Sequence, residues 1–197
     1  MFEYWRVRNP EIRRFFGGEY KSRVAMLEEE PTEAVAADAE LTIESDNVED
    51  GDTVTIGDIV YTFKDSFEND GEPYQVKVGT DNDESAENLK KAINKDGTEG
   101  TEYGKGTEAH PYVEADTDEA DNIVTVTAKT KGEVANEITV DEDMDNGEWD
   151  EDTLTGGVDG TVANKGEVRF DEDNLYIAVD DCTVSDSNWK KTSLSSL

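Results

Sequence analysis

The residues best suited to bind an ion form one acidic run, residues 141–152, with the sequence DEDMDNGEWDED. An EF-hand loop places carboxylates at its positions 1, 3, 5 and 12 and a glycine at position 6. Counted from its first residue, the run has carboxylates at those four positions, but its glycine is displaced by one and no helices are expected to flank it. We interpret the run as a solvated acidic loop that interrupts the β pattern. Binding of Ca²⁺ or Mg²⁺ is the alternative, and its ligands would be Asp141, Asp143, Asp145 and Asp152.

Nucleophilic catalysis lacks a base in this sequence. His110 is the only histidine and lies in a polar segment, which indicates a surface histidine. Cys182 is the only cysteine, which excludes an intrachain disulfide and a cysteine-rich metal site, and we expect it to be small and partly buried. The glycines in residues 156–160 lack the following helix and the Lys-Ser/Thr pair of a phosphate loop. We therefore expect no catalytic residues, no cofactor and no enzymatic activity.

The best candidate for a partner-binding site is the segment of residues 1–23. It holds six basic and three acidic residues, a net charge of +3, whereas the rest of the chain carries −35. Arginine together with large aromatic residues is typical of protein interfaces, and arginine pairs in a bidentate manner with carboxylates. The segment is interpreted as a docking arm, with the first elements of the main fold as the alternative. Nucleic acid is disfavoured because the acidic remainder would repel it. The predicted contacts are Phe2, Tyr4, Trp5, Arg6, Arg8, Arg13, Arg14, Phe15, Phe16 and Tyr20.

The composition predicts a folded protein adapted to high salt. The formal net charge is −32, from 50 acidic and 18 basic residues, and hydrophobic residues make up 34% of the chain. Such a charge would also suit disorder, but apolar residues keep a regular alternation over many segments, which disordered tails do not. At about 1 M salt the Debye length is about 3 Å, so a like-charged surface is tolerated. No window has the length of a membrane span and no secretory leader is recognisable, so we expect no membrane association.

The element expected to organise the fold is a β-hairpin in residues 51–63, GDTVTIGDIVYTF, with a two-residue turn at Gly57-Asp58. Its register would pair Ile56 with Ile59 and Val54 with Tyr61 on one apolar face. Residues 81–94 have the acidic first turn and apolar spacing of a helix, and Ser85 is an alternative cap for a shorter helix. Residues 24–40 are interpreted as a linker, and residues 96–106 as a stretch too polar for the core. Further strands are expected at residues 41–46, 74–79, 112–115, 123–128 and 137–140.

These elements predict an α+β fold, mostly antiparallel β-sheet with one packed helix, plus a small C-terminal β appendage. The appendage is a second hairpin, in which Val168 and Phe170 lie on one side of the loop at residues 171–174 and apolar residues recur at 175, 177 and 179 on the other. The expected organisation is an arm and linker in residues 1–31, a β-rich body in residues 32–160 and the C-terminal hairpin region in residues 161–197.

Several stretches resemble a module found in virion structural proteins of tailed phages and of tailed viruses of haloarchaea. They are GDTVTIGDIVYTF, VKVGTDNDESAENLKKAIN, the segment of residues 99–140 and TLTGGVDGT; residues 165–191 also resemble a short segment common in phage virion proteins. The resemblance covers about residues 41–191 and leaves out the arm. It implies a non-enzymatic capsid-surface decoration or turret protein, assembled in the host cytoplasm, that docks on the major capsid protein or another virion protein and forms homo-oligomers on a symmetric lattice. The alternatives are a tail or baseplate component and a Ca²⁺-dependent host-surface or carbohydrate-binding module.

Overall fold

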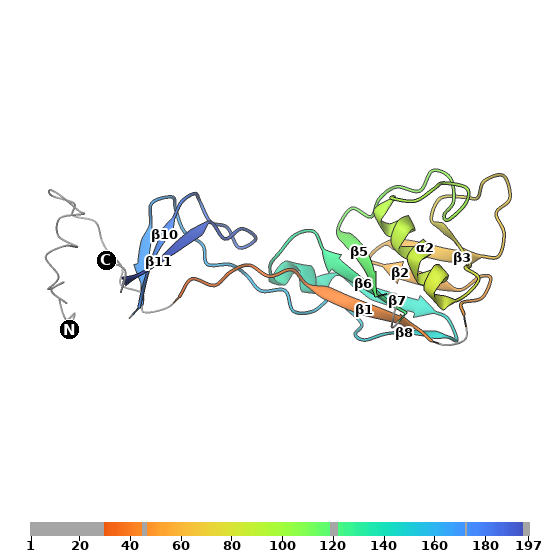
Figure 1. The fold of residues 1–197 in the computed structure, drawn as a ribbon, viewed down its shortest axis with the longest axis horizontal. Helices are drawn as coiled ribbons and strands as arrows, with labels where there is room; N and C mark the ends of the chain where they lie inside the picture. Colours follow the sequence, from red (N-terminus) through yellow and green to blue (C-terminus); the bar gives the residue numbers. More distant parts are fainter. Residues whose placement is uncertain (1–29, 45–46, 119–121, 172, 195–197) are drawn as a thin grey trace, which may run out of the picture.

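The computed structural model has a larger body and a small sheet, joined by a narrow neck (Figure 1). It describes residues 30–44, 47–118, 122–171 and 173–194. The body contains two four-stranded sheets and one long helix, and the small sheet has three strands. The predicted α+β class, mostly antiparallel with one helix and a small C-terminal β appendage, is confirmed.

The predicted hairpin has the predicted register. Strands β2 (Thr53–Ile56) and β3 (Ile59–Lys64) pair Ile56 with Ile59 and Val54 with Tyr61. Gly57 has φ +56°, the left-handed region that a two-residue turn requires and that glycine adopts without steric cost. Val54, Ile56 and Tyr61 are fully buried, so one face of the hairpin lies in the core. Burial of each such side chain contributes roughly 1.5–3 kcal/mol.

Each of the two body sheets is assembled from strands distant in sequence. The first sheet has the order β5-β6-β1-β8 and is antiparallel throughout, with β1 (Asp38–Ile43), β5 (Val113–Asp118), β6 (Ile123–Ala128) and β8 (Gly147–Trp149). The second sheet has the order β4-β3-β2-β7, with β4 (Gln75–Lys77) parallel to β3 and β7 (Val140–Asp143) antiparallel to β2. The buried side chains of both sheets belong to one hydrophobic core.

Helix α2 (Asn82–Asn94) packs against β4, β5 and β6. The side chain of Asp81 caps it by accepting a hydrogen bond from the Glu84 amide at 2.9 Å. Ser85 is therefore not the cap; it is buried within the helix, where its Oγ donates to Asn47. Leu89 and Ile93 are fully buried, as the predicted helical spacing requires.

The structure corrects three expectations for the body. The acidic run does not interrupt the β pattern, because it forms β7 and β8 and connects the two sheets. Residues 96–106 are not wholly outside the core: Tyr103 is 1% exposed, and Gly104 lets its backbone approach Glu72 more closely than any side chain would allow. Of the expected strand at residues 137–140, Glu137 ends a 3-10 helix, η1 (Glu133–Glu137), whereas Thr139 forms a β-bridge with Thr153 and Val140 begins β7.

The neck consists of residues 31–37 and 155–163, which lie side by side (Figure 1). Val35 and Val158 exchange both backbone hydrogen bonds, at 2.9 and 3.2 Å, and the amide of Thr161 donates to Thr32 at 2.9 Å. The expected linker therefore ends in ordered, hydrogen-bonded chain, and β1 begins at Asp38 instead of Leu41. Because two hydrogen-bonded segments of the chain form the neck, it is stiffer than a linker of one segment.

The small sheet has the strand order β11-β10-β9, with β9 (Val168–Phe170), β10 (Asn174–Ala178) and β11 (Trp189–Ser193). The predicted hairpin is β9 and β10, which pair Leu175 with Phe170. The connection between β10 and β11 packs on the neck, where the amide of Ala34 donates to Ser187 Oγ at 2.8 Å. In the described part of the chain, no helix has both the length and the apolar character to span a membrane.

Candidate functional site

The ten predicted docking residues, from Phe2 to Tyr20, lie outside the described residues. The structure does describe the point where the chain leads away from that arm. Glu30 and Pro31 lie against the small sheet, at the end of the molecule remote from the acidic body (Figure 1). The sequence predicted the arm but not this point of attachment.

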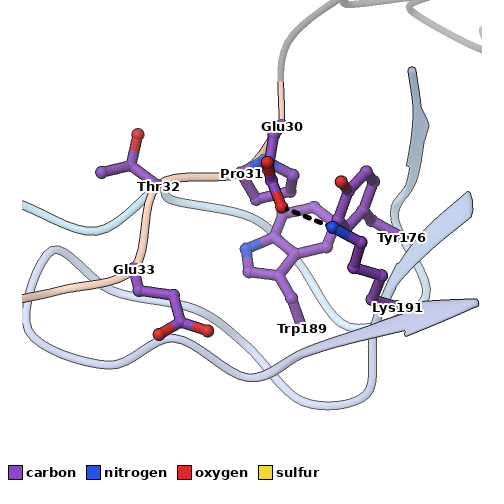
Figure 2. Close-up of a pocket in the computed structure, with 7 residues that line it drawn as sticks. All are labelled: Glu30, Pro31, Thr32, Glu33, Tyr176, Trp189 and Lys191. Carbon is purple, nitrogen blue, oxygen red and sulfur yellow. Dashed lines mark hydrogen bonds and ion pairs between the residues drawn. The ribbon is translucent and has the colours of Figure 1, made fainter. Parts of the chain in front are cut away.

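An open pocket of about 440 Å³ marks the attachment point (Figure 2). Residues 30–33 form one side, and Tyr176 of β10 with Trp189 and Lys191 of β11 form the other. Pro31 is buried in this junction. The Lys191 ammonium donates to the Glu30 carboxylate at 2.9 Å and lies 5.4 Å from the centre of the Tyr176 ring.

The electrostatics of this junction favour a contact role over proton transfer. The Tyr176 hydroxyl donates to Asp171 Oδ2 at 2.7 Å, and this hydrogen bond is the main reason that the pKa of Asp171 is lowered to about 2. The hydrogen bond to Glu30 raises the pKa of Lys191 to about 12, and burial raises the pKa of Tyr176. All three groups therefore keep their ordinary charge at neutral pH, whereas a general acid or base works best with a pKa near the operating pH. The ion pair itself is largely exposed and so contributes little stability.

Sequence reasoning missed this junction because both faces of the small sheet carry apolar residues. Alternation along β10 places Leu175 and Ile177 on one face and Tyr176 and Ala178 on the other. Tyr176 and Ala178 are the buried pair, at 3% and 1% exposure. The sequence signal at this junction was Pro31, which is equally typical of a linker.

The four predicted metal ligands do not converge. Asp141 and Asp143 are exposed on β7, and Asp145 lies in the turn that follows it. Asp152 lies at the opposite end of the same strand, where its carbonyl accepts from the amide of Val140 at 3.0 Å. Among the described residues, no group of three or more His, Cys, Asp or Glu side chains is placed to hold a metal ion. Cation binding at this corner stays a prediction without a formed site to support it.

The acidic corner is instead anchored by its apolar residues. Trp149 is 7% exposed and its indole N–H donates to the Asp141 carbonyl at 3.2 Å. Glu142 is half-buried, and burial, with the nearby carboxylates of Asp141 and Glu148, raises the pKa of its carboxyl. The corner is therefore a folded junction between the sheets with an outward-facing row of carboxylates.

His110 is not a surface residue as expected, because it is 1% exposed. Its Nδ1 accepts hydrogen bonds from the amides of Tyr112 at 3.3 Å and Val113 at 3.2 Å, and its Nε2 lies 3.2 Å from the carbonyl oxygen of Ile56. These contacts assign the neutral tautomer with the proton on Nε2. Burial lowers the pKa of the imidazole, with the Lys129 ammonium as a further, smaller cause. The side chain holds its loop against the β2–β3 hairpin, a structural role.

Cys182 is more deeply buried than expected, at 3% exposure, and lies in a small core with Ala163, Ala178 and Trp189. This small core, separate from the core of the body, holds the C-terminal sheet to the neck. Cys182 therefore acts as a small packing residue.

Comparisons of the chain with protein families, with curated proteins and with solved structures find no match. The resemblance to virion proteins therefore depends on the sequence stretches that carry it.

Proposed function

We propose that this chain is a non-enzymatic structural protein of a virion, a capsid-surface decoration or turret protein of a haloarchaeal tailed virus. Its N-terminal arm would grip the shell and its acidic body would project outward. The observation that carries the proposal is the separation of charge along the molecule. The small sheet is much less acidic than the body, and the chain that follows the basic arm in sequence meets the molecule at the small sheet.

The charge is concentrated in the body. Residues 32–160 contain 37 acidic and 8 basic residues, whereas residues 161–197 contain 7 acidic and 4 basic residues. The arm, residues 1–23, has an excess of three positive charges. Glu30 contacts the small sheet, and the neck separates this sheet from the acidic body (Figure 1). The segment that follows the arm in sequence therefore meets the rest of the protein at the less acidic end. An acidic partner would attract this end and repel the other, which would orient the molecule.

High salt limits how the arm could bind. At about 1 M salt the Debye length is about 3 Å, so long-range attraction between arm and shell is screened. Binding would then depend on direct contacts, for which bidentate Arg–carboxylate pairs and buried aromatic rings are well suited. The composition of the arm supplies both.

Among the described residues, five of the eight large hydrophobic residues with exposed side chains lie on the neck or near the small sheet, and the other three, Val60, Tyr112 and Val134, lie in the body. Val35 and Val158 lie side by side on the neck with 47% and 39% exposure, and Val162, Val179 and Val184 near the small sheet are 59%, 41% and 41% exposed. Adjacent exposed apolar residues, such as Val35 and Val158, can contribute to a protein contact surface. They support a role in assembly.

The test is the location of the protein in virus particles from cells that carry its gene. Mass spectrometry should detect the chain in purified particles, and antibody labelling should mark the outside of the capsid. Labelling confined to tails or baseplates would favour the tail-component alternative. Absence of the chain from purified particles would overturn the virion proposal.

A further inference from the structure

The second face of the small sheet carries apolar residues that belong to neither core. Leu175 lies opposite Phe170, and Ile177 opposite Val168, so these four side chains share one face. Each is partly exposed, and among the described residues none packs into the body core or the small core around Cys182. The opposite face is covered, since it carries Tyr176, Ala178 and Trp189 at the arm junction.

The third strand of the small sheet, β11, adds no carboxylate to this apolar face. Thr192 lies opposite Leu175 and Lys190 opposite Ile177. Lys190 is exposed, and its ammonium group forms no ion pair or hydrogen bond within the part of the chain that the structure describes. The contrast with the first body sheet is large, because two of its strands alone expose five carboxylates, Asp38, Glu40, Glu114, Asp116 and Asp118.

We propose that this apolar face is a self-association surface, on which the small sheet of a second copy packs face to face. An apolar sheet face is stable when another layer covers it, and stacked sheets lie about 10 Å apart. A second copy offers a face of the same size and the same apolar centre, with no carboxylate at the paired strand positions of that face. The neck keeps the two acidic bodies away from the contact, so association here avoids their mutual repulsion.

The size of the face sets the expected strength. With strands about 4.8 Å apart and a rise of about 3.3 Å per residue, the face covers on the order of 200 Å² per copy. Stable protein interfaces bury about 800 Å² per partner. The dimer is therefore weak in dilute solution, with a dissociation constant on the order of 0.1 mM, and becomes significant where copies are held side by side. The inference does not depend on the virion proposal, because the isolated protein would show it.

Sedimentation equilibrium of the full chain tests this inference, at protein concentrations from about 10 µM to about 1 mM in about 3 M KCl. The apparent mass should rise above the monomer value of 21.8 kDa towards twice that value. Leu175→Glu should weaken association at least about tenfold, because it places a carboxylate in the apolar centre of both copies. Val60→Glu is the matched control: Val60 is 48% exposed on the second body sheet, far from the proposed contact, and its variant should associate like the wild type.

A wild-type protein that stays monomeric over this range would overturn the proposal, as would equal association of wild type and Leu175→Glu. Because Leu175→Glu could disturb the small sheet itself, a photo-crosslinking residue at position 177 gives an independent result. In a mixture of ¹⁴N- and ¹⁵N-labelled protein, crosslinks should join residues 168–177 of two differently labelled chains. Crosslinks within one chain to residues 1–29 would show that the arm covers this face, and would overturn self-association.

Discussion

Substitution of His110 tests the most unexpected feature of the body. His110→Ala removes the acceptor of the buried Val113 amide and the donor to the Ile56 carbonyl, and it leaves the space of an imidazole ring. Each buried polar group left without a partner costs about 1–3 kcal/mol. We therefore expect the free energy of unfolding to fall by roughly 3–5 kcal/mol, a large share of the roughly 5–15 kcal/mol typical of a domain.

The same contacts predict how this loss depends on pH. Burial lowers the pKa of folded His110 below its unfolded value of about 6.5, so folding favours the neutral ring. Protonation of Nδ1 would also place a proton against the two amides that donate to it. The stabilisation by His110 is therefore fully present above about pH 6.5 and is lost as the pH falls below that value.

The assay is urea unfolding of wild type and His110→Ala in about 2 M KCl, at about pH 7.5 and about pH 5.5. The difference in unfolding free energy between the two proteins should be smaller at the lower pH. The carboxylates titrate in both proteins, so their contribution to the pH dependence cancels in that difference, and the sequence contains no other histidine. A difference that is the same at both pH values, or a loss below about 0.5 kcal/mol at pH 7.5, would contradict the proposed contacts of His110.

Three other predictions concern the body. Tyr61→Asp should abolish the cooperative unfolding transition, because it places a carboxylate where the side chain is fully buried. Tyr61→Phe should lower the free energy of unfolding by no more than about 1 kcal/mol, since the hydroxyl has no hydrogen-bond partner among the described residues. Lowering KCl from about 3 M to about 0.1 M should lower the thermal midpoint followed by circular dichroism, because the carboxylates of the body then repel one another; an unchanged midpoint would contradict the high-salt interpretation. Calorimetric titration of CaCl₂ in molar KCl should give no saturable heat, and a saturable heat that Asp141→Asn or Asp145→Asn removes would show a cation site at the acidic corner.

Local patterns were sufficient to predict the hairpin and the helix. The two-residue turn fixes the β2–β3 register. The face of the hairpin that carries Val54, Ile56 and Tyr61 must be buried for the strands to be stable. Helix α2 carries its cap and its apolar stripe within a single segment. In both elements, nearby residues contain nearly all of the information.

Contacts between distant segments could not be predicted in this way. The partners of His110 belong to the hairpin and to the segments around residues 93, 113 and 129, so only the assembled fold shows that the ring is buried. Strands β7 and β8 each have a single deeply buried apolar residue, Val140 and Trp149, and the surrounding carboxylates hide that alternation. The junction of Pro31 with the small sheet joins chain segments about 150 residues apart, beyond the reach of any local pattern.

The most direct test of the central claim is the binding of the protein to purified virus heads with and without its arm. The full chain should sediment with heads in molar KCl, while a chain lacking residues 1–23 should stay in the supernatant and keep the circular dichroism spectrum of a folded body. Replacement of Arg13 and Arg14 by alanine should weaken binding in the same direction without unfolding. Equal sedimentation of the full and shortened chains, or unfolding of the shortened chain, would contradict an anchoring arm on an independently folded body.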